Sequence, residues 1–287
     1  MRVEHHKITT IPFRAAHHTG GIITPSLVVL HDTAGRLDHG NTADYLRGDN
    51  PQKVSCHFVI ERDGSIEQQV PTNRRANHAG LSSYHGRAGC NTFSIGIELV
   101  NPGRMSRRPD DGYGPRGRAW WGQVFSGSDY ELAAMTTPEH GEGVWMAYSP
   151  DQIAATVKLL TVLFHGIPTL TDIRPHWYVS PGRKVDTNPL FPLEEVRTAV
   201  LGLDDPADLA VMAASDDLPT ATMIRVATNG AGLNMRRWPY SPQVLASVPH
   251  GTLLAPIREG VFDGRRHHLV QFDNREGWII SAYTQPA

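Results

Sequence analysis

Apolar runs that end in polar residues recur through the first 203 residues. SLVVLHDTA (26–34) predicts a strand buried on both faces that carries His31 at its carboxyl end. FSIGIELV (93–100) predicts a second such strand with Glu98 near its end. Between them, CHFVIERDGSIEQQV predicts a hairpin that turns at Asp63-Gly64. The runs indicate one central sheet.

Helical patterns alternate with these strands. NTADYLRGDN (41–50) predicts a short helix with Asn41 or Thr42 as its N-cap. PLEEVRTAVLG (192–202) predicts a last helix that ends at Gly202. Strands that alternate with helices make residues 1–203 an α/β domain.

The longest helix is predicted to begin after Ser149, which acts as N-cap. Pro150 takes the first helical position and Gln152 completes a capping box. The residues expected on its buried face are Ile153, Val157, Leu160 and Phe164. The stretch before it, 101–148, is rich in Gly, Pro, Arg and Trp without a usable period, so we expect a long irregular insertion of the kind that often forms a functional lid.

The end of the chain has a different pattern. Short strand-like runs separated by Gly, Pro and Asn fill residues 220–287 and predict a small all-β barrel or sandwich. Residues 204–219 hold five Asp and no basic residue, which predicts a linker. The C-terminal piece has seven Arg against four acidic residues, which suits an acidic polymer, although solvated surface Arg is the commoner explanation.

Composition narrows the class of protein. With 40% hydrophobic residues, 20% charged residues and a net charge of -2 in 287 residues, we expect a soluble globular protein that binds neither nucleic acid nor an anionic membrane. Only two cysteines exclude a disulfide-rich scaffold and a four-cysteine zinc module. The first residues lack the pattern of a signal peptide and no apolar stretch is long enough to span a membrane, so we expect synthesis in the cytoplasm.

Histidine is the abundant metal-capable residue, with fifteen copies. His31, His176 and Asp186 would give Zn²⁺ two imidazoles and one carboxylate, and leave a fourth position for a water whose pKa the metal lowers. Amide hydrolysis also needs a proton acceptor and a positive group beside the developing oxyanion. Glu98 and Lys184 are the candidates for these two roles.

Four stretches carry a resemblance to a known family: VVLHDTAG, VSCHFVIERDGSIEQQVPTNRRANHAG, GRAGCNTFSIGIELV and PGRKVDTNPLF. In this order they resemble the zinc-dependent N-acetylmuramoyl-L-alanine amidases of the AmpD and phage T7 lysozyme type, which are related to peptidoglycan recognition proteins. The resemblance implies a mixed central sheet with helices on its faces, and hydrolysis of the amide between N-acetylmuramic acid and the L-alanine of the stem peptide. It implies His31, His176 and Asp186 as ligands, Glu98 as acid/base and Lys184 as oxyanion stabiliser.

Asp186 and Glu98 place the chain nearest the AmpD branch, since T7-type enzymes have a cysteine and a tyrosine at these positions. HWYV (176–179) departs from the family, which more often has a small or acidic residue after the histidine. The C-terminal piece resembles a bacterial SH3-type domain through LNMRRWPYSPQVLASVPHGTLL and REGWIISAY. Such domains commonly bind cell-wall peptide or glycan.

Each candidate also has an ordinary structural interpretation. Asp186 could be a turn or helix-cap acid, Glu98 a buried acid paired with Arg, and Lys184 a solvated loop lysine. His78 could line the substrate groove or have only a structural, hydrogen-bonded role. We interpret His57 as structural.

Three other groups of residues are also open to a structural interpretation. Cys56 and Cys90 are expected to be small buried apolar residues. Trp120 and Trp121 could stack on sugar rings, but packing within the insertion is favoured. Two pairs of histidines near the N-terminus suggest a second metal site, although ordinary polar surface residues are the favoured interpretation. The pairs are His5 with His6, and His17 with His18.

Three functions compete at this point. The first is an endolysin-type, bacteriolytic amidase, encoded by a phage or prophage, that acts on the cell wall after release and is held there by its SH3-like domain. The second is a cytoplasmic amidase that recycles anhydromuropeptides. The third is a recognition module that binds peptidoglycan without cutting it, which the retained ligand set disfavours.

Overall fold

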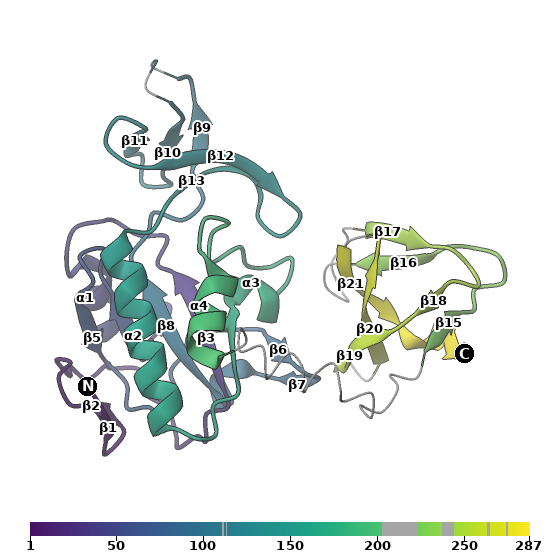
Figure 1. Ribbon diagram of the computed structural model, residues 1–287, viewed down its shortest axis with the longest axis horizontal. Coiled ribbons are helices and arrows are strands. Elements are labelled where there is room, and N and C mark those ends of the chain that lie inside the picture. Colours follow the sequence, from purple (N-terminus) through teal and green to yellow (C-terminus); the bar gives the residue numbers. More distant parts are fainter. Residues whose placement is uncertain (111, 113, 203–222, 237–243, 263–264, 274) are drawn as a thin grey trace. The chain divides into compact units, whose positions relative to one another are not determined.

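The computed structural model describes residues 1–287 except 111, 113, 203–222, 237–243, 263–264 and 274. The chain divides into two compact units (Figure 1). The larger unit comprises Met1–Gly80, Gly89–Val179 and Arg183–Asp204, and the smaller unit comprises Leu81–Ala88, Ser180–Gly182 and Asp205–Ala287. The predicted linker 204–219 lies outside the described residues.

A five-stranded sheet forms the centre of the larger unit, in the order β14-β3-β8-β4-β5. The first four strands are parallel and β5 is antiparallel to β4, so the sheet is mixed. Its strands are β14 (Asp172–Pro175), β3 (Leu27–Asp32), β8 (Ser94–Leu99), β4 (Phe58–Ile60) and β5 (Ile66–Gln68). The predicted α/β class is confirmed, as are the two buried strands and the hairpin around Asp63-Gly64.

The strands direct their side chains to opposite faces of the sheet. Val28, Leu30 and Ile97 belong to the main apolar core with Leu160 of the long helix. Because side chains alternate along a strand, His31 and Glu98 point to the other face. The two residues are also direct partners in the β3–β8 register. The sheet therefore brings two candidate site residues side by side on its second face.

Two helices cover the first face and lie side by side in Figure 1: α2 (Pro150–Gly166) and α4 (Leu193–Leu201). Ser149 caps α2 as predicted, since its side chain accepts from the Gln152 amide. The capping box is wrong, because Gln152 Nε2 donates to the carbonyls of Ile60 and Val100 instead. The predicted end of α4 at Gly202 is confirmed.

The helix α1 (Asn41–Arg47) packs on the other side of β4, where Ala43 and Leu46 meet Val59. The predicted N-cap is wrong. Gly40 caps α1 with a φ of 81°, and no side chain makes a cap hydrogen bond. The Gly40 amide donates to Glu61 Oε1 instead. A glycine suits this position because it adopts the left-handed region without strain.

The insertion 101–148 is not irregular, and that prediction is wrong. It forms an antiparallel sheet of β9 (Ser106–Arg108), β10 (Arg116–Arg118) and β11 (Val124–Ser126), and a hairpin of β12 (Leu132–Thr137) and β13 (Gly141–Met146). A small apolar cluster that includes Met105, Phe125 and Val144 supports it. The strands are short and several are rich in Arg and Gly, so no alternation of apolar residues marked them in the sequence.

Four further short strands and a 3₁₀ turn complete the first two hundred residues. They are β1 (Val3–Glu4), β2 (Lys7–Ile8), β6 (Ser83–Tyr84), β7 (Arg87–Ala88) and η1 (Cys90–Thr92). A single helical turn, α3 (His176–Val179), follows β14 directly. None of the helices in the described part of the chain combines the length and apolar content that crossing a bilayer requires.

The C-terminal part of the smaller unit is all-β, as predicted. It has a three-stranded sheet, β18-β15-β22, and a five-stranded sheet, β17-β16-β21-β20-β19. The elements are β15 (Ile224–Val226), β16 (Leu233–Arg236), β17 (Val244–Val248), β18 (Leu253–Leu254), β19 (Pro256–Phe262), β20 (Arg265–Phe272), β21 (Arg275–Ile280), η2 (Ser281–Tyr283) and β22 (Thr284–Pro286). Val226, Met235 and Val270 are fully buried in its core. An SH3-like barrel stays a prediction.

Candidate active site

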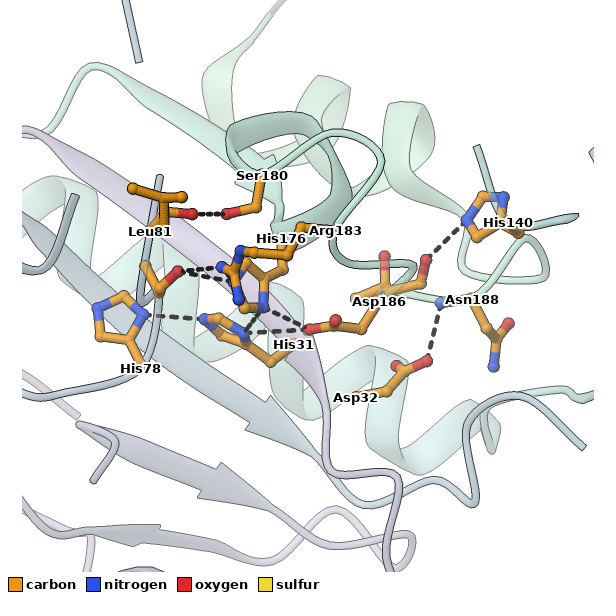
Figure 2. A network of polar contacts seen from close by, with 12 residues as sticks. His31, Asp32, His78, Leu81, His140, His176, Ser180, Arg183, Asp186 and Asn188 are labelled. Carbon is orange, nitrogen blue, oxygen red and sulfur yellow. Dashed lines mark hydrogen bonds and ion pairs between the residues drawn. The ribbon is translucent and has the colours of Figure 1, made fainter. Parts of the chain in front are cut away.

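Three predicted ligands meet at the carboxyl ends of β3 and β14. Pro175 pairs with Leu30 in the parallel register, so His176, the next residue along, lies beside His31. The Trp177 amide donates to the Asp186 carbonyl at 2.7 Å and holds the third residue next to them. Asp186 therefore lies beside both histidines. Figure 2 shows the three side chains pointing toward one another.

The distances between the facing atoms are short and nearly equal. His31 Nδ1 lies 2.9 Å from His176 Nδ1, and Asp186 Oδ2 lies 3.2 Å from the first and 2.9 Å from the second. Two ligand atoms of a tetrahedral Zn²⁺ are roughly 3.3 Å apart, as follows from metal–ligand distances of about 2.0–2.2 Å. The spacing of the three atoms fits one small cation.

Hydrogen bonds assign the proton positions around His31. The hydroxyl of Ser94 donates its proton to the Cys90 carbonyl at 2.6 Å. Because that proton is already used, Ser94 Oγ accepts a hydrogen bond from His78 Nε2, 3.2 Å away. His78 Nδ1 therefore carries no proton, and it accepts a hydrogen bond from the N–H of His31 Nε2 at 2.9 Å. A neutral His31 consequently presents a bare lone pair on Nδ1. Burial, followed by the nearby His176, lowers the pKa of His31 to about 4, which keeps the ring neutral.

His176 is oriented in the same way. Its Nε2 lies 3.0 Å from the carbonyl of Ala79, which can only accept, so this bond needs the proton on Nε2 and leaves Nδ1 bare. Arg183 Nη2, 3.1 Å from the same nitrogen, donates to that carbonyl at 2.6 Å. With the Asp186 carboxylate, three acceptor atoms face one another with no proton between them. Such a group repels itself unless a cation lies at its centre, and the donor set suits Zn²⁺.

Glu98 lies in the same cavity. Its Oε2 is shielded from solvent and makes no hydrogen bond to any residue that the structure describes. Burial raises the pKa of Glu98 to about 8, and the charges of Asp186 and Asp32 add to this effect. Among the described residues no Arg forms an ion pair with Glu98, so the alternative of a buried pair with Arg is not found there. A carboxyl whose pKa lies near neutrality is suited to proton transfer.

The cavity that holds these groups measures about 870 Å³. Its walls include all six predicted site residues, namely His31, His78, Glu98, His176, Lys184 and Asp186. Lys184 is half-buried there rather than fully solvated. The structure thus brings together residues that span 155 positions of the chain.

Residues 23–189 match the family model described as N-acetylmuramoyl-L-alanine amidase, which is more than half of the chain and contains every candidate site residue. The chain belongs to the N-acetylmuramoyl-L-alanine amidase family. The family match ends before the C-terminal all-β region, which lies outside it.

Relatives of this amidase-family chain carry related names. The 1,6-anhydro-N-acetylmuramyl-L-alanine amidase AmpD of Citrobacter freundii is 44% identical over 91 residues, 26% of this chain and 48% of that protein. The N-acetylmuramoyl-L-alanine amidase AmiD of Escherichia coli is 27% identical over 186 residues, 61% of this chain and 53% of that protein. A crystal structure of a selenomethionine AmpD derivative has 26% identity and a TM-score of 0.48, and covers 70% of this chain and 99% of that one. The chain spans about half the length of the curated relatives it matches.

Several residues that support the amidase-family site were not predicted from the sequence. Asp32 accepts the Asn188 amide at 2.8 Å and the Tyr148 hydroxyl, which fixes the segment just after Asp186. Burial raises the pKa of Asp32 to about 8. His140 of the insertion contacts the Thr187 carbonyl through Nε2 at 2.9 Å (Figure 2). The only signal for Asp32 was its position directly after His31.

The insertion also supplies part of the cavity wall. Trp121 packs in the small core of the insertion, as predicted. The packing prediction is wrong for Trp120, which is 79% exposed, lines the cavity and donates from Nε1 to the Ala34 carbonyl at 2.7 Å. Trp177, the departure from the family pattern, lies against His140 with ring centroids 5.8 Å apart. The insertion therefore contacts residues next to each of the three predicted ligands: Ala34 near His31, Trp177 after His176 and Thr187 after Asp186.

His57, which we interpret as structural, is held by two hydrogen bonds. His57 accepts the Gly96 amide on Nδ1 and donates from Nε2 to the Arg74 carbonyl at 2.8 Å. Burial lowers the pKa of His57 to about 4. Cys56 and Cys90 are both buried, as predicted.

His78 is expected to position His31 rather than only to line the groove. Its ring lies against Gly96, where an added Cβ would come within 2.5 Å of His78 Cγ. His78→Ala removes the acceptor for His31 Nε2 and should weaken Zn²⁺ binding about 10–100-fold, as for other residues that orient metal ligands. Competition with a chelating indicator measures this affinity. His78→Asn, which retains an oxygen near the position of Nδ1, should restore most of it, and unchanged affinity in His78→Ala would contradict the assignment.

Proposed function

We propose that this chain is a zinc-dependent peptidoglycan amidase that hydrolyses the amide between N-acetylmuramic acid and the L-alanine of the stem peptide. The observation that carries the proposal is the set of three facing acceptor atoms in one cavity with Glu98, whose Oε2 makes no hydrogen bond to the described residues. The family match and the names of the relatives support the choice of bond.

His31, His176 and Asp186 would hold the metal. When bound, Zn²⁺ supplies Lewis acidity that polarises the scissile carbonyl and lowers the pKa of a water. In its ionised form, Glu98 accepts the proton of the attacking water as the C–O bond forms. It then returns this proton to the nitrogen as the C–N bond of the tetrahedral intermediate breaks. Lys184 places a positive charge in the cavity where the carbonyl oxygen gains negative charge.

An amidase of this kind could have either of two physiological substrates, the intact cell wall or soluble anhydromuropeptides. We favour an endolysin-type enzyme that acts on the intact wall after release, because the chain carries an additional all-β region beyond the family match. A recycling amidase for 1,6-anhydromuropeptides is the alternative, and the AmpD relatives favour it by name. Rates on intact sacculi and on soluble anhydromuropeptide distinguish them. Hydrolysis confined to the soluble substrate would overturn the endolysin assignment.

Trp120 is expected to contribute to binding of a large substrate. Its exposed indole borders the cavity near Ala34, where a sugar ring could stack on it. Trp120→Ala should raise KM for sacculi roughly 2- to 12-fold with little change in kcat, because such aromatic contacts contribute about 0.5–1.5 kcal/mol. Val124→Ala, an exposed position in the same insertion, is the control. Equal KM values for the two variants would assign Trp120 no role in binding.

We infer that the all-β region of the smaller unit binds the cell wall. A cavity of about 460 Å³ there is lined by Asn234, Trp278 and Tyr283, among others. Tyr283 is 52% exposed, so its ring is available to a ligand. Tyr283→Ala in the full chain should reduce retention on sedimented cell walls several-fold and leave hydrolysis of soluble muropeptide unchanged. A variant that sediments with walls like the parent protein would exclude this cavity as the wall-binding site.

A further inference from the structure

A second cluster of metal-capable side chains lies outside the candidate active site. Among the residues that the structure describes, two groups bring His or acidic ligand atoms within 4.8 Å of one another. The first is the active-site set and the second is His17, His18 and Asp49. The second group has the same composition, two imidazoles and one carboxylate.

The backbone fixes both parts of this cluster. The His17 amide donates to the Arg47 carbonyl at 2.9 Å, at the end of α1. Ser55 Oγ donates to the His18 carbonyl at 2.7 Å. Asp49 follows Gly48, whose amide caps the same helix. The two histidines and the carboxylate therefore meet because their main chains are held together.

The side chains are close enough to share an ion. Asp49 Oδ1 lies 3.2 Å from His18 Nε2 and 3.7 Å from His17 Nε2. These values bracket the separation of roughly 3.3 Å expected for two ligands of a tetrahedral Zn²⁺. His18 Nε2 is shielded from solvent, and it makes no hydrogen bond within the described part of the chain. Exposed His17 can adjust its rotamer to complete the set.

We propose that His17, His18 and Asp49 form a second binding site for a divalent transition-metal ion, with Zn²⁺ as the favoured species. Two imidazoles select zinc-like ions over Mg²⁺ and Ca²⁺, which prefer sites made of oxygen ligands. The ion would join the N-terminal segment to the connection after α1. Pro51 and Gln52 of that connection line the active-site cavity, so the second ion stabilises one wall of it.

Metal stoichiometry tests the proposal without measuring activity. Each protein is stripped with a chelator and dialysed against buffered Zn²⁺, and bound zinc is then measured by elemental analysis. We expect two ions in the parent, one in His176→Ala, one in His18→Ala and none in the double variant. The His176→Ala background makes the result independent of the function proposed for the first site.

Matched controls guard against general effects of removing a surface side chain. His39 lies 3.6 Å from Asp63 as a single exposed imidazole–carboxylate pair, so His39→Ala should bind as many ions as the parent. Asp49→Asn should lose the same ion as His18→Ala, with unchanged circular dichroism in both. The proposal is overturned if His18→Ala and Asp49→Asn bind as much zinc as the parent protein.

Discussion

Replacing His176 by alanine is expected to remove one equivalent of bound Zn²⁺ and to lower amide hydrolysis below about a thousandth of the parent rate. The reason is that several kcal/mol of transition-state stabilisation depends on the cation that this residue helps to hold. Elemental analysis of the protein and release of L-alanyl peptides from sacculi measure the two effects. The ion proposed at His17, His18 and Asp49 should stay in place.

His165→Ala is the matched control for this variant. His165 lies on the exposed side of α2, where its ring contacts the Thr161 carbonyl, and it does not border the active-site cavity. It should keep the parent metal content and rate. A His176→Ala protein with unchanged zinc and activity would remove His176 from the ligand set.

Replacing Glu98 by glutamine is expected to lower kcat by about 10²–10⁴-fold while the zinc content and KM stay near the parent values. This is the range that a positioned general acid or base contributes. Steady-state kinetics on soluble muropeptide measure the loss. Glu61→Gln is a matched control, because Glu61 is also buried with a raised pKa but lies outside the cavity and accepts the Gly40 amide.

The same variant has a stability signature. The pKa of Glu98 is raised from its usual 4.5 to about 8, so the fold holds the neutral carboxyl, and its contribution to stability is lost as the pH rises between these values. Glutamine resembles the neutral form. In metal-free protein, unfolding of Glu98→Gln should therefore depend less on pH than unfolding of the parent. Identical pH profiles would indicate that Glu98 is solvated.

The strands and the positions of His31 and Glu98 on them could be predicted because their signals are local. Mostly apolar runs mark β3 and β8, and the site residues His31 and Glu98 lie near the carboxyl ends of these strands. Their placement on one face follows from alternation along the strands. Asp186 needed the family motif, since a carboxylate before Thr-Asn-Pro is otherwise typical of a turn.

Other features depend on contacts between distant segments, which no local pattern records. Asp32 meets Tyr148 across 116 positions, and His140 reaches the ligand-bearing segment from the insertion. The exposure of Trp120 depends on how the insertion folds, and its strands carry Arg and Gly where alternating apolar residues would have marked them. The N-cap of α1 is Gly40 and not the predicted Asn41 or Thr42. The Gly40 amide donates to the side chain of Glu61, a contact between segments that the local sequence does not record.

The central claim is that three convergent ligands and Glu98 together break one particular amide. Mass spectrometry of sacculi digested by zinc-loaded protein tests it most directly. We predict stem peptides with a free L-alanine amino terminus and intact glycan strands, and no products after chelation. Cleavage within the stem peptide or the glycan, or digestion that continues unchanged without metal, would contradict the account.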